Sequence, residues 1–407
     1  MIGYALYYVI RKNLSIAMPL LGEIGVTKVQ LGAFLTCGGI VYGVGRFLNG
    51  IVADRNSARK VMVLGLVICA LVNIAFGCVG AIAWLMGLLW IVNSYFQGMG
   101  VGPCIKTLPQ WFPPEELSTK QSIWNLSHSV GAGAVFALCG WFLIPAFHSW
   151  RLCFIVPALV ALAGAMAIVF LFKDSPADLG FPAILTMSTK PLATADEKSA
   201  YKAYVREHVF RNPRVWTIAV ADFFVYTVRF AALDWGIVLL METKGLSLAQ
   251  ATTLCFVFEI VGGNCGMVVA GWVTDRFFGS RSHRTSVFCM LGAALSILVF
   301  WAVPTSAPLA VKLVPFLFVG FFIYGPQALL GIATTQQATP RAAGVAGGFV
   351  GIFSYASILL SGIGFGYIAQ RWGWNMAYMT ILAAALAGGA VLMLIWRDAV
   401  GDSSLTK

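Results

Sequence analysis

Charged residues are scarce in this sequence of 407 residues: they make up 11% of it, whereas an average soluble domain carries about 25%. Hydrophobic residues supply 59%. Such a chain cannot cover most of its surface with groups that bind water, so a soluble globular fold is excluded. Helices satisfy their own backbone groups in lipid, and each crossing takes roughly 20 apolar residues. We therefore expect an all-α integral membrane protein.

Histidine is also rare, with 4 residues, and the 9 cysteines are spread singly through apolar stretches. Metal centres need ligands at short spacing, so no metal and no cofactor is predicted. No nucleophile stands near a base outside the apolar runs, so enzyme activity is not expected. Met1 leads into an apolar run without a basic segment or cleavage site, which argues against a signal peptide. The abrupt start of this run suggests that the first helix lacks part of its natural beginning.

Long apolar runs, by contrast, are plentiful, and they predict twelve membrane-spanning helices in two pseudo-symmetric bundles of six. The expected ranges are 2–21, 29–53, 61–80, 83–111, 121–146, 152–172, 213–240, 248–274, 285–304, 311–335, 343–369 and 374–396. The only extended polar stretch separates the two sets of six, and residues 197–208 within it are expected to form a short surface helix. The predicted organisation is a first bundle over 1–173, a cytoplasmic linker over 174–212, a second bundle over 213–400 and a tail over 401–407.

Acidic residues are fewer than basic ones, with 16 Asp and Glu against 27 Lys and Arg, which gives a net charge of +11. Most of the cations fall in the linker, near the termini and in loops on that side of the predicted bundles. The positive-inside rule then places both termini in the cytoplasm of a bacterial-type inner membrane. We expect no nucleic-acid partner. The cations that fall inside predicted helices are Arg11, Lys12, Arg46, Lys106 and Arg229.

The two halves repeat each other at an offset of about 220 residues, which predicts an internal duplication. Parallel halves around a mid-membrane site are typical of secondary transporters. One repeated pair is Tyr8-x-x-Arg11 and Tyr226-x-x-Arg229. The other pair, Gly-x-x-x-Asp-Arg at a helix end, comprises Gly50, Asp54 and Arg55 in the first half and Gly271, Asp275 and Arg276 in the second. We assign this second pair to conformational switching, with ordinary anchoring at the membrane edge as the alternative.

Arginine inside a membrane costs several kcal/mol unless it faces a cavity or a partner, so it marks a functional site by default. Arg11 and Arg229 hold corresponding positions in the repeat, and we expect both to bind an anion. Their planar guanidinium groups suit the oxygens of phosphate, and carboxylate is the competing anion. A structural salt bridge from Arg229 to Asp222, Asp234 or Glu259 is the alternative.

Other polar side chains in the predicted helices are candidates for the same site. His128 could exchange a proton when a phosphate dianion arrives, or could be structural. Polar groups also hold helices together, and Lys12, Arg46 and Lys106 could point away or reach the membrane surface. The candidate lining residues are Tyr4, Tyr8, Lys12, Arg46, Gln97, Asn125, Tyr226, Glu259, Tyr324 and Tyr355.

Several longer segments, spread over nearly the whole chain, carry a more specific signal. They are Tyr7-Tyr8-Val-Ile-Arg11-Lys12-Asn13, Phe96-Gln97-Gly98-Met99-Gly100, Trp124-Asn125-Leu-Ser127-His128, Tyr226-Thr-Val-Arg229-Phe-Ala-Ala-Leu-Asp234-Trp235 and Tyr324-Gly325-Pro326. Together they resemble the organophosphate:phosphate antiporters of the major facilitator superfamily. The resemblance implies that Arg11 and Arg229 bind the phosphoryl group, that His128 assists, and that Arg46 lines the cavity where many relatives carry lysine.

The predicted function is therefore the exchange of a sugar phosphate, either hexose phosphate or glycerol 3-phosphate, for inorganic phosphate by alternating access, in a monomer. The stretch from Arg229 to Gly236 looks more like the hexose-phosphate and sensor branches of the family. One alternative is a sugar-phosphate receptor of the same fold that regulates a membrane histidine kinase. Another is a proton-driven exporter of organic anions or drugs, for which Glu259 is the candidate coupling acid.

Overall fold

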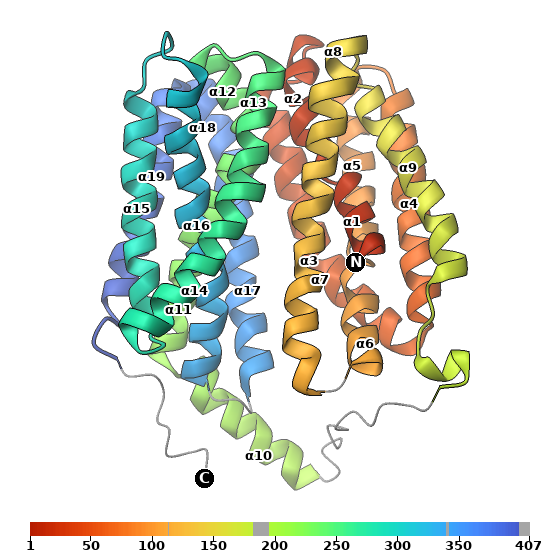
Figure 1. The fold of residues 1–407 in the computed structure, drawn as a ribbon, viewed down its shortest axis with the longest axis vertical. Helices are drawn as coiled ribbons and strands as arrows, with labels where there is room; N and C mark the ends of the chain where they lie inside the picture. The colour runs from red at the N-terminus through yellow and green to blue at the C-terminus, as the bar shows by residue number, and fades with distance from the viewer. Residues whose placement is uncertain (113, 182–194, 339–341, 399–407) are drawn as a thin grey trace. The chain divides into compact units, whose positions relative to one another are not determined.

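The computed structural model describes residues 1–112, 114–181, 195–338 and 342–398, and this part of the chain is built from helices (Figure 1). Ten of its helical stretches are long and apolar enough to cross a membrane. The prediction of an all-α, multi-pass membrane protein is confirmed.

The chain divides into two compact units. Unit 1 comprises Met1–Thr189 and Leu246–Phe256, and unit 2 comprises Lys190–Gly245 and Val257–Lys407. The first boundary lies within the linker region predicted from the sequence. The short segment Leu246–Phe256 is grouped with unit 1, although it follows the start of the predicted second bundle.

The helices of unit 1 follow the predicted ranges closely. They are α1 (Ile2–Val9), α2 (Asn13–Glu23), α3 (Lys28–Arg55), α4 (Ala58–Cys78), α5 (Ala83–Gln97), α6 (Val101–Trp111), α7 (Pro114–Val135), the π-helix η1 (Phe136–Leu143), α8 (Ile144–Phe147), α9 (Leu152–Leu171), the short 3-10 helix η2 (Pro176–Leu179) and α13 (Leu248–Phe256).

Unit 2 contains the linker helix and the remaining helices. They are α10 (Ala195–Val205), the π-helix η3 (Arg206–Phe210), α11 (Pro213–Asp234), α12 (Gly236–Lys244), the π-helix η4 (Val257–Gly263), α14 (Asn264–Phe278), α15 (Ser282–Ala302), α16 (Leu309–Ala338), α17 (Ala343–Leu359), the π-helix η6 (Leu360–Gly364), α18 (Phe365–Arg371) and α19 (Gly373–Met393).

Three predicted crossings are interrupted, contrary to the expectation of continuous helices. The crossing predicted at 2–21 consists of α1 and α2, which are separated by Ile10–Lys12. The crossing predicted at 83–111 consists of α5 and α6, which are separated at Gly98–Gly100. The crossing predicted at 213–240 consists of α11 and α12, which are separated at Trp235. At the break between α5 and α6 the backbone lies directly against α3, because a Cβ on Gly98 would stand 2.5 Å from the Arg46 backbone nitrogen. Close approach of two backbones explains why glycine occupies that position.

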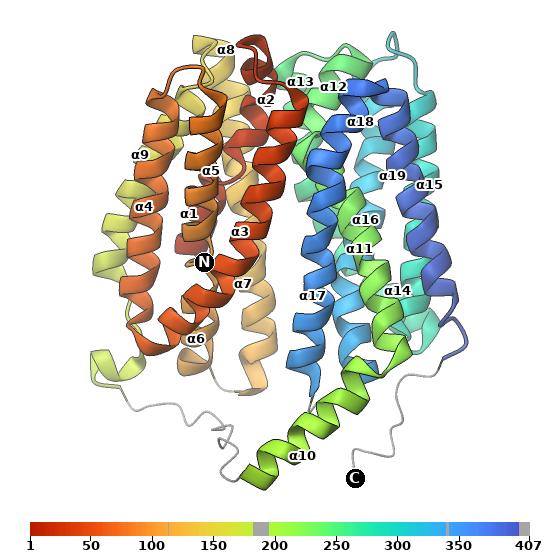
Figure 2. The same cartoon turned by 180° about the vertical axis from the view of Figure 1, so that it is seen from behind.

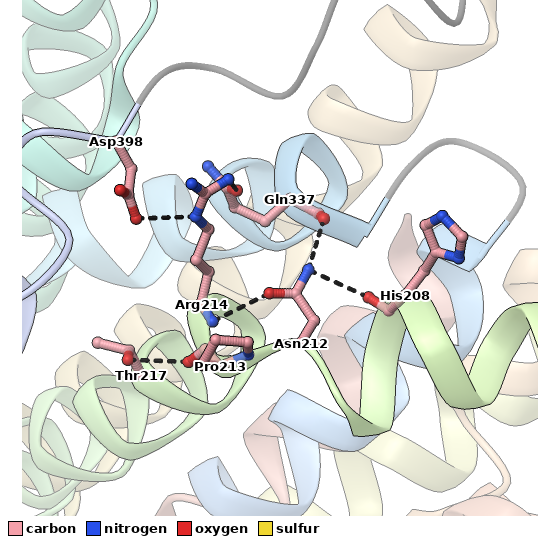
Figure 3. A network of polar contacts seen from close by, with 7 residues as sticks. All are labelled: His208, Asn212, Pro213, Arg214, Thr217, Gln337 and Asp398. Atoms are coloured by element: carbon pink, nitrogen blue, oxygen red, sulfur yellow. Dashed lines mark hydrogen bonds and ion pairs between the residues drawn. The ribbon is translucent and has the colours of Figure 1, made fainter.

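The surface helix predicted at 197–208 corresponds to α10 and η3, which lead to the start of α11 (Figure 2). A polar cluster fixes this end of unit 2 (Figure 3). The Arg214 Nε lies 2.9 Å from a carboxylate oxygen of Asp398. The Asn212 amide donates to the backbone oxygens of Gln337 at 3.0 Å and His208 at 3.3 Å. These contacts tie the linker, the start of α11, the end of α16 and the chain beyond α19 to one another.

Candidate functional site

Arg11 lies in a cluster of aromatic side chains within unit 1. Its guanidinium carbon is 3.9 Å from the ring centre of Tyr42 on α3 and 5.3 Å from that of Tyr8 on α1. The Tyr8 ring lies 5.4 Å from the Tyr4 ring and 5.5 Å from the His128 ring. Cation–π contacts of this kind stabilise a cation by about 0.5–2 kcal/mol. The tyrosine rings therefore hold the guanidinium group in place. We call Arg11, Tyr4, Tyr8, Tyr42 and His128 the Arg11 cluster.

Two residues of this environment, Tyr42 and Trp124, were not predicted as site residues from the sequence. Tyr42 is 3% exposed and stands one helical turn before Arg46 on α3, a spacing that should have drawn attention to it. The Trp124 ring on α7 lies 4.9 Å from the Tyr4 ring. Tyr42 therefore contacts the arginine directly, whereas Trp124 packs on Tyr4.

His128 is buried, and its ring joins the Arg11 cluster through Tyr8. Its Nε2 lies 3.3 Å from the hydroxyl oxygen of Ser129, the next residue on α7. An imidazole in this position can donate or accept a hydrogen bond according to its tautomer. The neighbouring candidate Asn125 has a side chain that lies outside the described part of the structure.

The other predicted polar residues of unit 1 fall in different places. Lys12 is 8% exposed and lies in the break between α1 and α2. Gln97 is 3% exposed, and its amide donates to the Ile10 backbone oxygen at 3.3 Å. Arg46 is exposed on α3. Lys106 donates to the backbone oxygens of Ala53 and Asn56, at 2.9 and 2.7 Å, and so caps the end of α3.

Arg229 lies in a second cluster, within unit 2, and is 8% exposed. Its Nη2 donates to the Tyr324 hydroxyl on α16 at 3.4 Å, and its guanidinium carbon is 5.0 Å from the centre of that ring. The ring centres of Tyr226 and Phe230 lie 5.8 and 5.7 Å from the same guanidinium carbon. Its buried Nε has no hydrogen-bond acceptor among the described residues. This guanidinium group is thus held by aromatic rings while a buried donor is left for another acceptor.

The acids named as counter-ions for Arg229 differ in their surroundings. Glu259, fully buried on η4, interacts electrostatically with Arg229. Asp222 is 5% exposed and accepts a hydrogen bond from the Ser354 hydroxyl on α17. The charge of Arg229 is therefore balanced in part by Glu259, while Asp222 belongs to a separate contact.

Close packing between η4 and α16 positions Tyr324. A Cβ on Gly263 would lie 3.1 Å from the Tyr324 ring, and one on Gly262 would lie 2.5 Å from the Leu317 backbone oxygen. The glycines allow the π-helix to rest directly on α16, and π-helical turns are frequent at functional sites. Tyr355, the remaining candidate, is half-buried on α17 next to Ser354.

The residues assigned to switching stand at helix ends. Gly50 and Gly271 have open space where a Cβ would lie, and Arg55 and Arg276 are exposed. Asp275 accepts a hydrogen bond from the Ser280 hydroxyl at 3.0 Å, just beyond the end of α14. The side chain of Asp54 lies outside the described part of the structure. Their switching role stays a prediction.

Residues 1–362 match the family model of the Major Facilitator Superfamily. The chain belongs to this superfamily. It is 35% identical over 405 residues to the glycerol-3-phosphate transporter of Bacillus subtilis (strain 168), an alignment that covers 97% of this chain and 90% of the relative. It is 33% identical over 403 residues to the membrane sensor protein UhpC of Salmonella typhimurium (strain LT2), with 98% and 90% covered.

The fold is also that of solved members of the superfamily. The nucleoside transporter NupG, solved as a point mutant, superposes with a TM-score of 0.76 at 12% identity, with 97% of each chain covered. At this identity the likeness shows the fold alone. The predicted resemblance to organophosphate transporters of the Major Facilitator Superfamily is confirmed, and the protein is a transporter-family member and not an enzyme.

Proposed function

We propose that this member of the Major Facilitator Superfamily transports an organophosphate and exchanges it for inorganic phosphate by alternating access. One observation carries the proposal. Arginines at corresponding positions of the internal repeat are each surrounded by tyrosine rings: Arg11 in the break between α1 and α2, and Arg229 within α11. A guanidinium group in lipid needs an anion, and it binds phosphate oxygens with paired hydrogen bonds.

The chemistry of the surrounding groups supports reversible binding of an anion. The buried Nε of Arg229 provides a donor for a phosphate oxygen, and the Tyr324 hydroxyl is within reach of the same guanidinium group. His128 provides a group that can take up a proton when a phosphate dianion binds. Binding of the anion neutralises the arginines and so lowers the cost of closing the site, which couples occupancy to the change of conformation.

The substrate class follows from the relatives. The Bacillus relative is a glycerol-3-phosphate transporter, and we propose a sugar phosphate or glycerol 3-phosphate as the substrate here. We further propose that the protein is a monomer in a bacterial-type inner membrane with both termini in the cytoplasm, because the cations concentrate on the side of the linker.

Counterflow in proteoliposomes tests this function. Vesicles loaded with labelled inorganic phosphate should release it when glycerol 3-phosphate or glucose 6-phosphate is added outside. Arg11→Lys and Arg229→Lys should each abolish the release, since lysine lacks the planar pair of donors. Arg371→Lys is the matched control, because Arg371 is exposed at the end of α18. If neither substrate, nor phosphoglycerate, releases phosphate from wild-type vesicles, the exchange function is refuted.

The similarity to a membrane sensor protein favours a second candidate function. In this case the protein binds a sugar phosphate in the same way and regulates a membrane histidine kinase. Sugar-phosphate binding to purified protein without any counterflow would support the sensor. Counterflow at rates that rise with the amount of reconstituted protein would support the transporter.

A further inference from the structure

We propose that Asn73, Asn93 and Gln97 are positioning residues that fasten the break in the first membrane helix and thereby hold Arg11 in place to bind the anion. The proposal rests on the proposed function for the identity of the anion. It gives Gln97 a role different from lining the cavity, and it adds two asparagines that were not predicted from the sequence.

The break itself needs an explanation, because it lies inside an apolar run and has neither glycine nor proline at it. Helix α1 ends at Val9 and α2 begins at Asn13. The backbone nitrogens of Arg11 and Lys12 both donate to the Tyr8 oxygen, at 3.2 and 3.1 Å. A backbone carbonyl at such a break must find a partner within the protein, since lipid offers none.

Side-chain amides provide that partner for the Ile10 carbonyl. It accepts hydrogen bonds from the Asn73 amide on α4 at 3.3 Å and from the Asn93 amide on α5 at 3.4 Å. The Gln97 amide, one turn further along α5, donates to the same oxygen at 3.3 Å. The three donors are 1%, 1% and 3% exposed. Donors from two helices therefore converge on the one carbonyl that immediately precedes Arg11.

The chain is also fastened on the other side of the break. The Asn13 amide donates to the Asn73 side-chain oxygen at 2.8 Å and to the Cys153 backbone oxygen at 3.1 Å. The Asn73 amide in turn donates to the Asn93 side-chain oxygen at 3.0 Å and to the Cys69 backbone oxygen at 2.8 Å. Arg11 and Lys12 are thus bracketed between two points that are both attached to Asn73.

This arrangement differs from that of the repeat-related arginine. Arg229 lies within the uninterrupted helix α11, so its backbone is positioned by regular helical hydrogen bonds. Arg11 lies outside a helix, and its backbone is positioned by side chains of α4 and α5. Misplacement of a binding group by about 1 Å can cost up to about a hundredfold. The amides therefore act on binding through Arg11.

Asn49 provides a matched control. Its side chain is also 1% exposed, and its amide also donates to a backbone oxygen, that of Tyr95 on α5, at 3.0 Å. This bond joins α3 to α5 and does not involve the break. Asn49→Leu removes a buried amide of the same unit, whereas Gln97→Met removes one of the three amides at the Ile10 carbonyl with little change in side-chain length. Gln97 is preferred to Asn73 because its side chain bonds to Ile10 and to no other described residue, so the fold should survive.

The experiment compares both variants with the wild type as purified full-length protein in detergent. Hydrogen exchange, followed by mass spectrometry, reports on the amides of residues 9–16. Inorganic phosphate is the binding probe, and thermal unfolding gives the melting temperature. We expect Gln97→Met to speed exchange in this peptide and to raise the Kd for phosphate by about tenfold or more. Asn49→Leu should leave the exchange rate of this peptide and the Kd for phosphate unchanged. It should lower the melting temperature by at least as much as Gln97→Met does.

Two results would overturn the proposal. One is unchanged exchange at residues 9–16 in Gln97→Met. The other is a loss of phosphate affinity in Gln97→Met that is no larger than the loss in Asn49→Leu. That result would mean that the amides only hold helices together. If the wild type binds no phosphate at all, the proposed function fails instead, and the exchange comparison alone decides whether the amides hold the break.

Discussion

At the scale of single residues, the contact between Arg229 and Tyr324 is a direct test of how the second arginine is held. Tyr324→Phe keeps the ring beside the guanidinium group and removes the hydroxyl that accepts from Nη2. A hydrogen bond of this kind contributes about 0.5–1.5 kcal/mol, so we expect phosphate to bind about 2- to 10-fold more weakly.

Binding of inorganic phosphate to the purified variant checks this prediction. Tyr378→Phe is the control, because the Tyr378 hydroxyl is paired with Thr243 at 3.1 Å in the same unit. Equal affinities for Tyr324→Phe and the wild type would show that the hydroxyl does not contribute to the site.

The contact between Asp222 and Ser354 makes a prediction about stability. Ser354 donates to the buried Asp222 carboxyl, and Asp222 makes no other polar contact among the described residues. Ser354→Ala leaves this carboxyl without its donor and should lower the free energy of unfolding by about 1–3 kcal/mol. Asp222→Asn should cost less, because its amide can donate to the serine oxygen. Thermal unfolding of the two variants in the same detergent measures the difference, and a larger loss for Asp222→Asn would contradict this account.

At the scale of helices, glycine positions show where two backbones touch. A Cβ on Gly266 would clash with the Phe321 carbonyl on α16, whereas Gly271, on the same helix α14, faces open space. Gly266→Ala should destabilise the fold by about 1–3 kcal/mol, since a backbone in the way must shift. Gly271→Ala should be neutral or slightly stabilising, because alanine is the better helix former.

Yield of folded protein and thermal unfolding in detergent compare the two glycine variants. A Gly266→Ala protein as stable as Gly271→Ala would mean that α14 and α16 can separate at little cost.

The sequence predicts the helices better than their interruptions. Apolar runs mark the crossings because lipid demands some 20 apolar residues in a helix, wherever the helix stands in the fold. The break at Ile10–Lys12 has no such local cause. It depends on Asn73, Asn93 and Gln97, which are distant in the chain and meet only in the folded unit. Pro326, a residue that commonly interrupts helices, lies inside α16 without ending it.

The candidate site follows the same pattern. Arg11 and Arg229 could be found from the sequence because a cation in an apolar helix stands out and because the repeat pairs them. For Tyr42 the sequence offers only a weaker signal, its spacing of one helical turn before Arg46, because its contact with Arg11 comes from a different helix. Charge is visible along the chain, whereas the neighbours that hold a charge are set by tertiary packing.

At the scale of the whole molecule, the uneven charge distribution predicts its orientation in the membrane. In the predicted topology the side of the linker carries most of the 27 Lys and Arg, among them Arg214, which is paired with Asp398. Cations are retained on the cytoplasmic side during insertion. Exposed positions at the two ends of unit 2 can report the orientation: Ser199 lies on the linker helix α10, and Ser306 lies in the loop between α15 and α16.

Cysteine labelling tests this orientation in cells. The exposed native thiols Cys37, Cys78 and Cys265 are first replaced by serine, and Ser199→Cys or Ser306→Cys is added singly. A membrane-impermeant maleimide should label Ser306→Cys in intact spheroplasts and Ser199→Cys only in inverted vesicles. The reverse pattern would place the linker outside the cell. It would also contradict the positive-inside rule for this protein, because most of its cations would then lie outside the cell. The +11 net charge could then not be used as a guide to orientation.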